Sequence, residues 1–178
     1  LTAWFSILLT GWAAFNLIGV LISAGIVVYS LRSIRQLSSF PLPPTDFAFP
    51  SVSLIAPARN EERNIEAAVR SLLRLDYPGL EITIVNDRST DRTGEILQHL
   101  ADENPRLQVV TVTELPAGWL GKNHAMHLGA ERSRGDWLLF TDADVIFDPS
   151  ALRRGIYFAR TNEIDHLAVA PDCRMEPW

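Results

Sequence analysis

The sequence predicts an α/β domain with a parallel sheet covered by helices on both faces, preceded by one transmembrane helix. Two observations carry this prediction. From Ser51 onward, short apolar runs alternate with segments of helical periodicity, and this strand-helix-strand order is typical of a parallel sheet. Before that point, residues 1–31 contain no Asp, Glu, Lys, Arg or His. The length of 178 residues favours one domain with an appendage.

The apolar segment from Trp4 to Tyr29 is long enough to cross a bilayer, for which about 20 residues suffice. Arg32 and Arg35 follow it and no basic residue precedes it, so the positive-inside rule predicts a single-pass inner-membrane protein with a cytoplasmic domain. The alternative is a cleaved signal peptide, which would have a basic start and a shorter apolar core. We therefore expect the transmembrane helix within residues 1–31.

Residues 32–50 are expected to form a proline-rich tether, because proline disfavours helix and favours extended backbone. Its prolines are Pro41, Pro43, Pro44 and Pro50. Three phenylalanines make it too apolar for a free linker, so part of it is expected to lie on the membrane or on the domain. The domain itself is expected to occupy residues 51–178.

Four strands are expected at Val52–Ala56, Glu81–Val85, Leu107–Val112 and Trp137–Thr141. The last is a continuous apolar run with large side chains, which predicts a strand buried on both faces. Leu167–Ala170 is a candidate for one more strand.

Helices are expected between and after these strands. Asn60 is the expected N-cap of the first, whose core face carries Ile65, Ala68, Val69, Leu72 and Leu73. The second begins near Ser89–Asp91 and buries Ile96, Leu97 and Leu100, and the third runs from about Lys122 to Arg132. Asp148 and Pro149 are expected as the N-cap and first residue of the last helix, which buries Leu152, Ile156 and Ala159.

Polar residues follow three of the strands, at positions 57–62, 86–91 and 141–144. The carboxyl ends of parallel strands meet at one edge of a sheet, where α/β proteins bind nucleotides. Asp87 is suited to accept a hydrogen bond from a pyrimidine imide N–H, because a carboxylate only accepts. Lys122 stands at a helix start, where free N–H groups and a cation suit a phosphate.

Asp142 and Asp144 are two residues apart, so on a regular strand both side chains point to one side. Paired carboxylates repel each other unless a cation lies between them, and hard divalent ions prefer oxygen ligands. The pair therefore predicts a metal site, although an isolated Asp-x-Asp more often caps a turn. Similarly, Asn60, Ser89 and Asp91 are as consistent with helix caps as with a binding site.

The sequence argues against several classes of protein. No Gly-rich phosphate loop is present, which argues against dehydrogenases and ATPases. The net charge of −5 gives no support for nucleic-acid binding. A single cysteine, Cys173, excludes an internal disulfide and fits a reducing compartment. The histidines have no metal-ligand spacing, so we interpret them as structural or acceptor-side residues; they are His99, His124, His127 and His166.

Together, four motifs resemble family 2 glycosyltransferases: Pro57-Ala58-Arg59-Asn60-Glu61-Glu62, Val85 to Thr93, Gly118-Trp119-Leu120-Gly121-Lys122-Asn123-His124-Ala125, and Asp142-Ala143-Asp144. The Gly-Trp-Leu-Gly-Lys segment most resembles bacterial membrane-anchored enzymes acting on lipids such as carotenoid or hopanoid precursors. The resemblance implies the GT-A fold, a UDP-sugar donor, a lipid acceptor and Mg²⁺ or Mn²⁺.

The resemblance also implies roles for individual residues. Asp87 would contact the nucleotide base, while Pro57 and Glu61, with Asn60 in the same motif, would shape the base and ribose pocket. Lys122 would lie near the diphosphate. Asp142 would reach the ribose or sugar, and Asp144, with Asp142, would bind the metal.

The implied reaction is single displacement with inversion, in which an acceptor hydroxyl attacks the anomeric carbon. Its general base is expected beyond Trp178, so residues 51–178 would be a donor-binding portion that is incomplete at its C-terminus. A polyprenyl-phosphate glycosyltransferase and a non-catalytic nucleotide-sugar-binding module are the alternatives.

Overall fold

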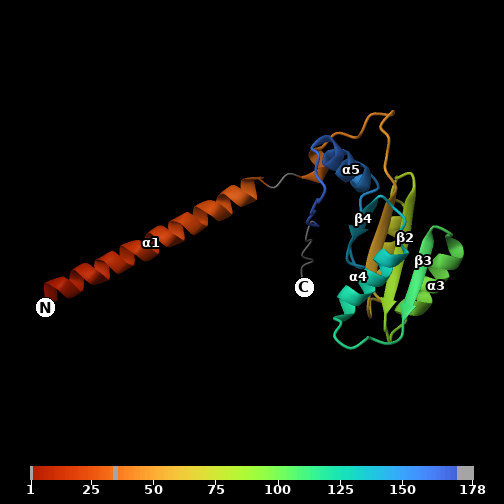
Figure 1. Cartoon of the computed structure of the whole chain (residues 1–178), viewed down its shortest axis with the longest axis horizontal. Coiled ribbons are helices and arrows are strands. Elements are labelled where there is room, and N and C mark those ends of the chain that lie inside the picture. The colour runs from red at the N-terminus through yellow and green to blue at the C-terminus, as the bar shows by residue number, and fades with distance from the viewer. Residues whose placement is uncertain (1, 34–35, 172–178) are drawn as a thin grey trace. The chain divides into compact units, whose positions relative to one another are not determined.

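The computed structural model describes residues 2–33 and 36–171. The chain divides into two compact units, Leu1–Ser39 and Phe40–Trp178. The first contains the long helix and the second contains the sheet with its covering helices (Figure 1).

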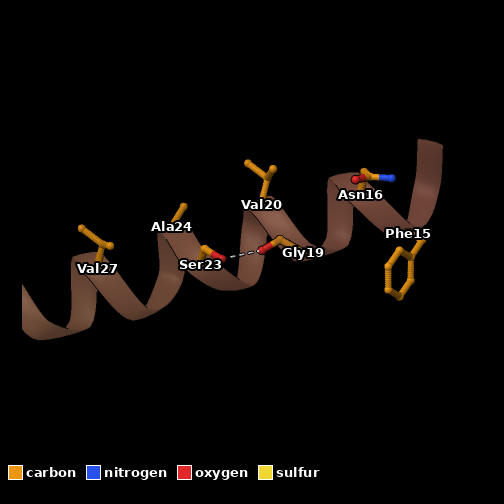
Figure 2. A pocket seen from close by; sticks show the side chains of 7 residues that line it. All are labelled: Phe15, Asn16, Gly19, Val20, Ser23, Ala24 and Val27. Carbon is orange, nitrogen blue, oxygen red and sulfur yellow. Dashed lines mark hydrogen bonds between the residues drawn. The ribbon is translucent and has the colours of Figure 1, made fainter. Parts of the chain in front are cut away.

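The first unit is dominated by α1 (Thr2–Ser33), a helix of 32 residues, followed by the short 3₁₀ helix η1 (Leu37–Ser39). Within α1, Gly11–Tyr29 is long and apolar enough to cross a membrane, and its side chains are all exposed. Two of its polar side chains bond to their own helix. Asn16 donates to the Trp12 carbonyl at 2.8 Å. Ser23 donates to the Gly19 carbonyl at 2.8 Å (Figure 2). Such internal pairing suits apolar surroundings.

The second unit is a four-stranded, fully parallel sheet in the order β3-β2-β1-β4 (Figure 1). The strands are β1 (Val52–Ala58), β2 (Leu80–Asp87), β3 (Leu107–Val112) and β4 (Trp137–Phe140). The helices are α2 (Ile65–Leu73), α3 (Thr93–Glu103), α4 (Gly121–Arg132) and α5 (Ala151–Thr161). The predicted parallel α/β architecture is therefore confirmed.

Helices cover both faces of this sheet. The larger core packs alternate β1 side chains such as Leu54 against residues of α2, α3 and α5, including Leu72, Leu97 and Ile156. On the opposite face, α4 packs on β1 and β2. A Cβ atom at Gly129 of α4 would stand 2.4 Å from Cγ2 of Ile55, so glycine allows the helix to approach the sheet this closely.

β4 is not buried on both faces, contrary to the prediction. Trp137 and Leu139 pack against the larger core, but Leu138 and Phe140 on the other face are 45% and 44% exposed. The reason is that α4 covers β1 and β2 and does not extend over β4. A run of apolar residues in the sequence does not indicate which helix covers which strand, so the exposure of one face of β4 could not be predicted.

The start of β4 is fixed to β1 by two serines. Ser53 Oγ accepts a hydrogen bond from the Gly135 N–H at 2.9 Å. The Asp136 carboxylate accepts from the Ser51 hydroxyl at 2.7 Å and from the Ser51 N–H at 3.1 Å. These bonds set the observed register, in which Val52 lies beside Trp137.

The segment of residues 40–50, here called the aromatic arm, packs on the rest of the second unit. The Phe40 and Phe158 rings are 4.5 Å apart, and the Phe47 and Tyr157 rings are 5.1 Å apart. The Tyr77 hydroxyl donates to the Pro50 carbonyl at 2.7 Å. The arm therefore contacts α5 and the segment that precedes β2, as its phenylalanines suggested.

Three local predictions were wrong. The first sheet-covering helix begins at Ile65, because Asn60 has a left-handed φ of 56° and cannot lead directly into a helix. The last begins at Ala151 with Ser150 as N-cap, and the Asp148 carboxylate instead accepts from the Ser150 N–H at 2.8 Å. Residues 167–170 form no strand, and the Leu167 side chain lies near Gly155 of α5.

Candidate nucleotide-binding site

An open cleft of about 430 Å³ lies at the carboxyl ends of β1, β2 and β4 and at the start of α4. Its lining residues are Pro57, Ala58, Arg59, Glu61, Asp87, Gly121, Lys122, Asp142, Ala143 and Asp144. Every site residue predicted from the sequence is in this set except Asn60. The parallel sheet brings them together because each lies at or just after the carboxyl end of a strand, or begins helix α4.

Asn60 is not a lining residue of the cleft, and it instead joins the loops that follow β1 and β2. Its side-chain carbonyl accepts from the Thr90 N–H at 2.8 Å, and its own N–H donates to Ser89 Oγ at 3.1 Å. Two further bonds join the same loops: the Glu61 N–H donates to Thr93 Oγ1 and the Glu62 N–H donates to Asp91 Oδ2. The polar residues after β1 and β2 are thus tied to each other.

Asp87, at the end of β2, is only 3% exposed and is held by its neighbour. Arg88 donates from Nε to Oδ1 at 2.7 Å and from Nη2 to Oδ2 at 3.0 Å. These hydrogen bonds lower the pKa of Asp87 against the opposing effect of burial, and the charges of Arg59 and His124 lower it further. Arg88 adopts a left-handed φ of 54°, a strained conformation that places its guanidinium beside the carboxylate.

On the other side of the cleft, Lys122 Nζ donates to Asp142 Oδ1 at 2.5 Å. Asp144 lines the cleft two residues further along. Burial raises the pKa of Glu61, and the negative charges of Asp144, Asp91 and Asp142 raise it further. The acidic side chains of this half of the cleft therefore repel one another, and a cation is favoured between them.

The donor set fits a divalent metal that shares its coordination with a substrate. No group of three or more His, Cys, Asp or Glu side chains suited to hold a metal occurs among residues 2–33 and 36–171. Mg²⁺, however, is commonly bound by one or two carboxylates, with phosphate oxygens and waters as its other ligands. Asp142 and Asp144 supply that number of carboxylates.

The histidines lie outside the cleft lining. Trp119 stacks on His127 with ring centroids 5.0 Å apart and meets His124 edge-on at 5.4 Å. His124 is 8% exposed, and its Nδ1 has no hydrogen-bond partner within the described ranges. His99 and His127 lie beside Glu103 and Glu131 of their own helices. The structure thus places His99, His124 and His127 on helices beside carboxylates or an aromatic ring.

Sequence reasoning did not assign Arg59, Arg88 or Gly121 to the site. Arg59 and Gly121 line the cleft, and Arg88 holds Asp87. The signal for Gly121 was its place beside Lys122 at a helix start. For Arg88, no pattern in the sequence indicates that its side chain turns back onto the preceding residue.

Fold and cleft together define an α/β domain with an acidic cleft at the carboxyl edge of a parallel sheet, which is where such sheets bind their ligands. Comparison with known proteins gives the family: residues 53–177 match the model of glycosyl transferase family 2, and the chain belongs to that family. Its α/β unit has the GT-A fold.

Two relatives with known names are similar to this chain in sequence. The chain is 37% identical over 141 residues to beta-monoglucosyldiacylglycerol synthase of Synechocystis sp., covering 73% of this chain and 29% of the relative. It is 34% identical over 117 residues to 4,4'-diaponeurosporenoate glycosyltransferase of Staphylococcus haemolyticus, covering 66% and 30%. The chain thus spans less than a third of the length of either relative.

Two solved structures resemble the domain. One is the mannosyltransferase PcManGT from Pyrobaculum calidifontis in complex with GDP-Man and Mn²⁺, with a TM-score of 0.58 and 27% identity, covering 75% of this chain and 39% of that one. The other is S. aureus TarS 1-349 in complex with UDP-GlcNAc, with a TM-score of 0.54 and 27% identity, covering 64% and 32%.

Proposed function

We propose that this chain supplies the donor-binding part of a membrane-anchored glycosyltransferase that moves a sugar, with inversion, from a metal-bound nucleotide-sugar to a lipid acceptor. The observation that carries the proposal is the convergence of Asp87, Lys122, Asp142 and Asp144 on one cleft. These residues come from two strand ends and a helix start that lie far apart in the sequence. A volume of about 430 Å³ is in the usual range for a small-molecule site.

Each residue has a role that its chemistry supports. Asp87 would accept a hydrogen bond from an N–H of the nucleotide base, held in orientation by Arg88. Lys122, with the first N–H groups of α4, would bind the diphosphate. Asp142 and Asp144 would hold Mg²⁺ or Mn²⁺, which when bound offsets the negative charge of the diphosphate leaving group.

The base is expected to be uracil, as the family resemblance implies. The two structural neighbours bind GDP-Man and UDP-GlcNAc respectively. Both uracil and guanine present an N–H beside a carbonyl, so Asp87 and the adjacent Arg88 donors suit either edge. Titration with both nucleotides therefore decides this point.

Different observations support the proposed lipid acceptor and the proposed membrane anchor. By their names, one of the two relatives makes a monoglucosyldiacylglycerol and the other glycosylates 4,4'-diaponeurosporenoate. The apolar segment Gly11–Tyr29 of α1 suits a single membrane span. An anchored enzyme with a membrane-dissolved acceptor is consistent with both observations.

Isothermal calorimetry on the detergent-solubilised chain tests the donor site. UDP or a UDP-sugar is expected to bind in the presence of Mn²⁺ and much more weakly in the presence of a chelator. Asp144→Asn should remove the metal-dependent part, because an amide replaces a charged ligand. Asp102→Asn, the same change on the exposed surface of α3, is the control. Equal affinity with and without metal in the wild type would contradict the proposal.

A further inference from the structure

Lys122 forms an ion pair with Asp142, which is not expected of a residue whose only role is to bind the diphosphate. Its ammonium lies 2.5 Å from Asp142 Oδ1, so it neutralises a carboxylate that the proposed function assigns to the metal. Lys122 is also the only lysine in the sequence, in which every other strongly basic side chain is an arginine.

The surroundings explain why a cation is held there. Glu61, Asp142 and Asp144 all line this part of the cleft, and their negative charges act on one another. The Lys122 and Asp142 side chains are 60% and 58% exposed, so their ion pair is weak and easily exchanged. The lysine ammonium, on its flexible side chain, binds the carboxylate at one point. An arginine would bind it with two parallel hydrogen bonds and would be harder to displace.

We propose that Lys122 is a placeholder cation: it occupies Asp142 in the donor-free protein and leaves it for the diphosphate when metal and nucleotide enter together. This inference rests on the proposed function. Metal alone binds weakly, because it must displace the ammonium and leave it facing a second cation. When the nucleotide arrives, its diphosphate offers Lys122 a new partner and the metal further ligands. Metal and donor therefore strengthen each other's binding, and by linkage they do so by the same factor.

The first test is titration of Mn²⁺ alone into wild-type protein, Lys122→Met and Arg59→Met. Lys122→Met is expected to bind Mn²⁺ alone roughly two- to fivefold more tightly, in line with the loss of one exposed competing ion pair. The factor by which Mn²⁺ raises UDP affinity should fall correspondingly. Arg59→Met removes a positive charge from the same cleft and leaves the Lys122–Asp142 pair intact. Its affinity for Mn²⁺ alone should therefore increase clearly less than that of Lys122→Met.

These outcomes separate the two proposals. Absence of metal-dependent UDP binding in the wild type overturns the proposed function and this inference with it. Normal metal-dependent UDP binding, with Lys122→Met no better than wild type for Mn²⁺ alone, overturns the inference only. An equal gain in Lys122→Met and Arg59→Met also overturns it, because the effect would then be a general one of charge.

The second test uses the single lysine as a spectroscopic probe. Reductive methylation with ¹³C-formaldehyde labels Lys122 and the terminal amine, keeps both charges, and leaves one lysine methyl resonance, identified by its loss in Lys122→Met. That resonance is expected to shift in Asp142→Asn without any ligand, and to move to a different position in the wild type when Mg²⁺ and UDP are added together. A resonance that is the same in wild type and Asp142→Asn would show that the ion pair is not populated and would overturn the inference.

Discussion

Gly121 lies directly against the carboxylate of Asp87. A Cβ atom at position 121 would stand 2.5 Å from Asp87 Oδ2 and 2.6 Å from Arg88 Nη2, both closer than real Cβ contacts allow. The first residue of α4 is therefore a glycine because the Asp87–Arg88 pair fills the space where a side chain would be.

This contact predicts that Gly121→Ala weakens nucleotide binding about tenfold or more, a loss of about 1.4 kcal/mol. The nearly buried Asp87 has little room to move, so the pair must be displaced. Calorimetry with UDP and Mn²⁺ measures the effect, and the thermal midpoint should change little, because alanine favours helix over glycine. Unchanged affinity would mean that the carboxylate is free to shift.

A second close approach sets the position of α4 on the sheet. In Gly129→Ala, the new methyl group would overlap Cγ2 of Ile55, and we expect a loss of about 1–3 kcal/mol in the free energy of unfolding. Ile55→Ala alone should cost about 2–5 kcal/mol by leaving a cavity. The double variant should be less destabilised than the sum of the two, as urea denaturation followed by tryptophan fluorescence would show. Strict additivity would indicate that the helix moves away instead.

The aromatic arm depends on Tyr77. Removing its hydroxyl in Tyr77→Phe leaves the Pro50 carbonyl without its donor, which should cost about 1–3 kcal/mol of unfolding free energy. Burial raises the pKa of Tyr77 well above its usual range, with a smaller effect from the Asp136 charge, so the hydrogen bond should persist through mildly alkaline pH.

Chymotrypsin reports the state of the arm independently. Phe40 and Phe49 are each followed by proline, so Phe47–Ala48 is the phenylalanine bond of the arm open to cleavage. Cleavage there should be faster in Tyr77→Phe. Tyr157→Phe is the matched control, since its ring would still pack on Phe47. Equal cleavage of both variants would contradict a role for the Tyr77 bond.

Asp136 makes stability depend on pH. The hydrogen bonds from Ser51 lower the pKa of Asp136 relative to the unfolded chain. Its contribution is therefore fully present above the unfolded pKa and is lost as the pH falls through the folded pKa. Urea midpoints measured from neutral to strongly acidic pH should fall less steeply in Asp136→Asn than in the wild type. Asp102→Asn should follow the wild type, and identical slopes in all three proteins would contradict the assignment.

The orientation in the membrane is a separate prediction. Arg32 and Arg35 follow the apolar segment, so the second unit should be cytoplasmic. A reporter fused after Trp178 should be active only in the cytoplasm, and the second unit should resist protease added to intact spheroplasts. Digestion from outside would reverse the orientation.

Much of the domain was predictable because its signals are local. The apolar runs of β1, β2 and β3 alternate with amphipathic helices, and parallel pairing then brings their polar ends to one edge without further information. Asp87 and Asp142 could be placed in one cleft by that argument, and Lys122 by its position at a helix start.

The rest depends on contacts between distant segments. Asn60 looked like a helix cap, but its partners are Ser89 and Thr90, about thirty residues away, and its left-handed φ delays the helix. Leu138 and Phe140 looked buried, yet their exposure depends on how far α4 extends across the sheet. Neither fact is contained in the residues themselves.

The serine contacts at the start of β4 have a consequence for how this chain tolerates change. They anchor Gly135 and Asp136, and the count of residues from there to Asp142 decides which side chains emerge into the cleft. Because β4 ends at Phe140 and side chains alternate along a strand, one residue inserted or deleted between positions 136 and 140 would exchange the two faces of β4 and shift Asp142 away from Lys122. The length of this stretch is therefore more tightly constrained than the identity of its exposed residues, Leu138 and Phe140.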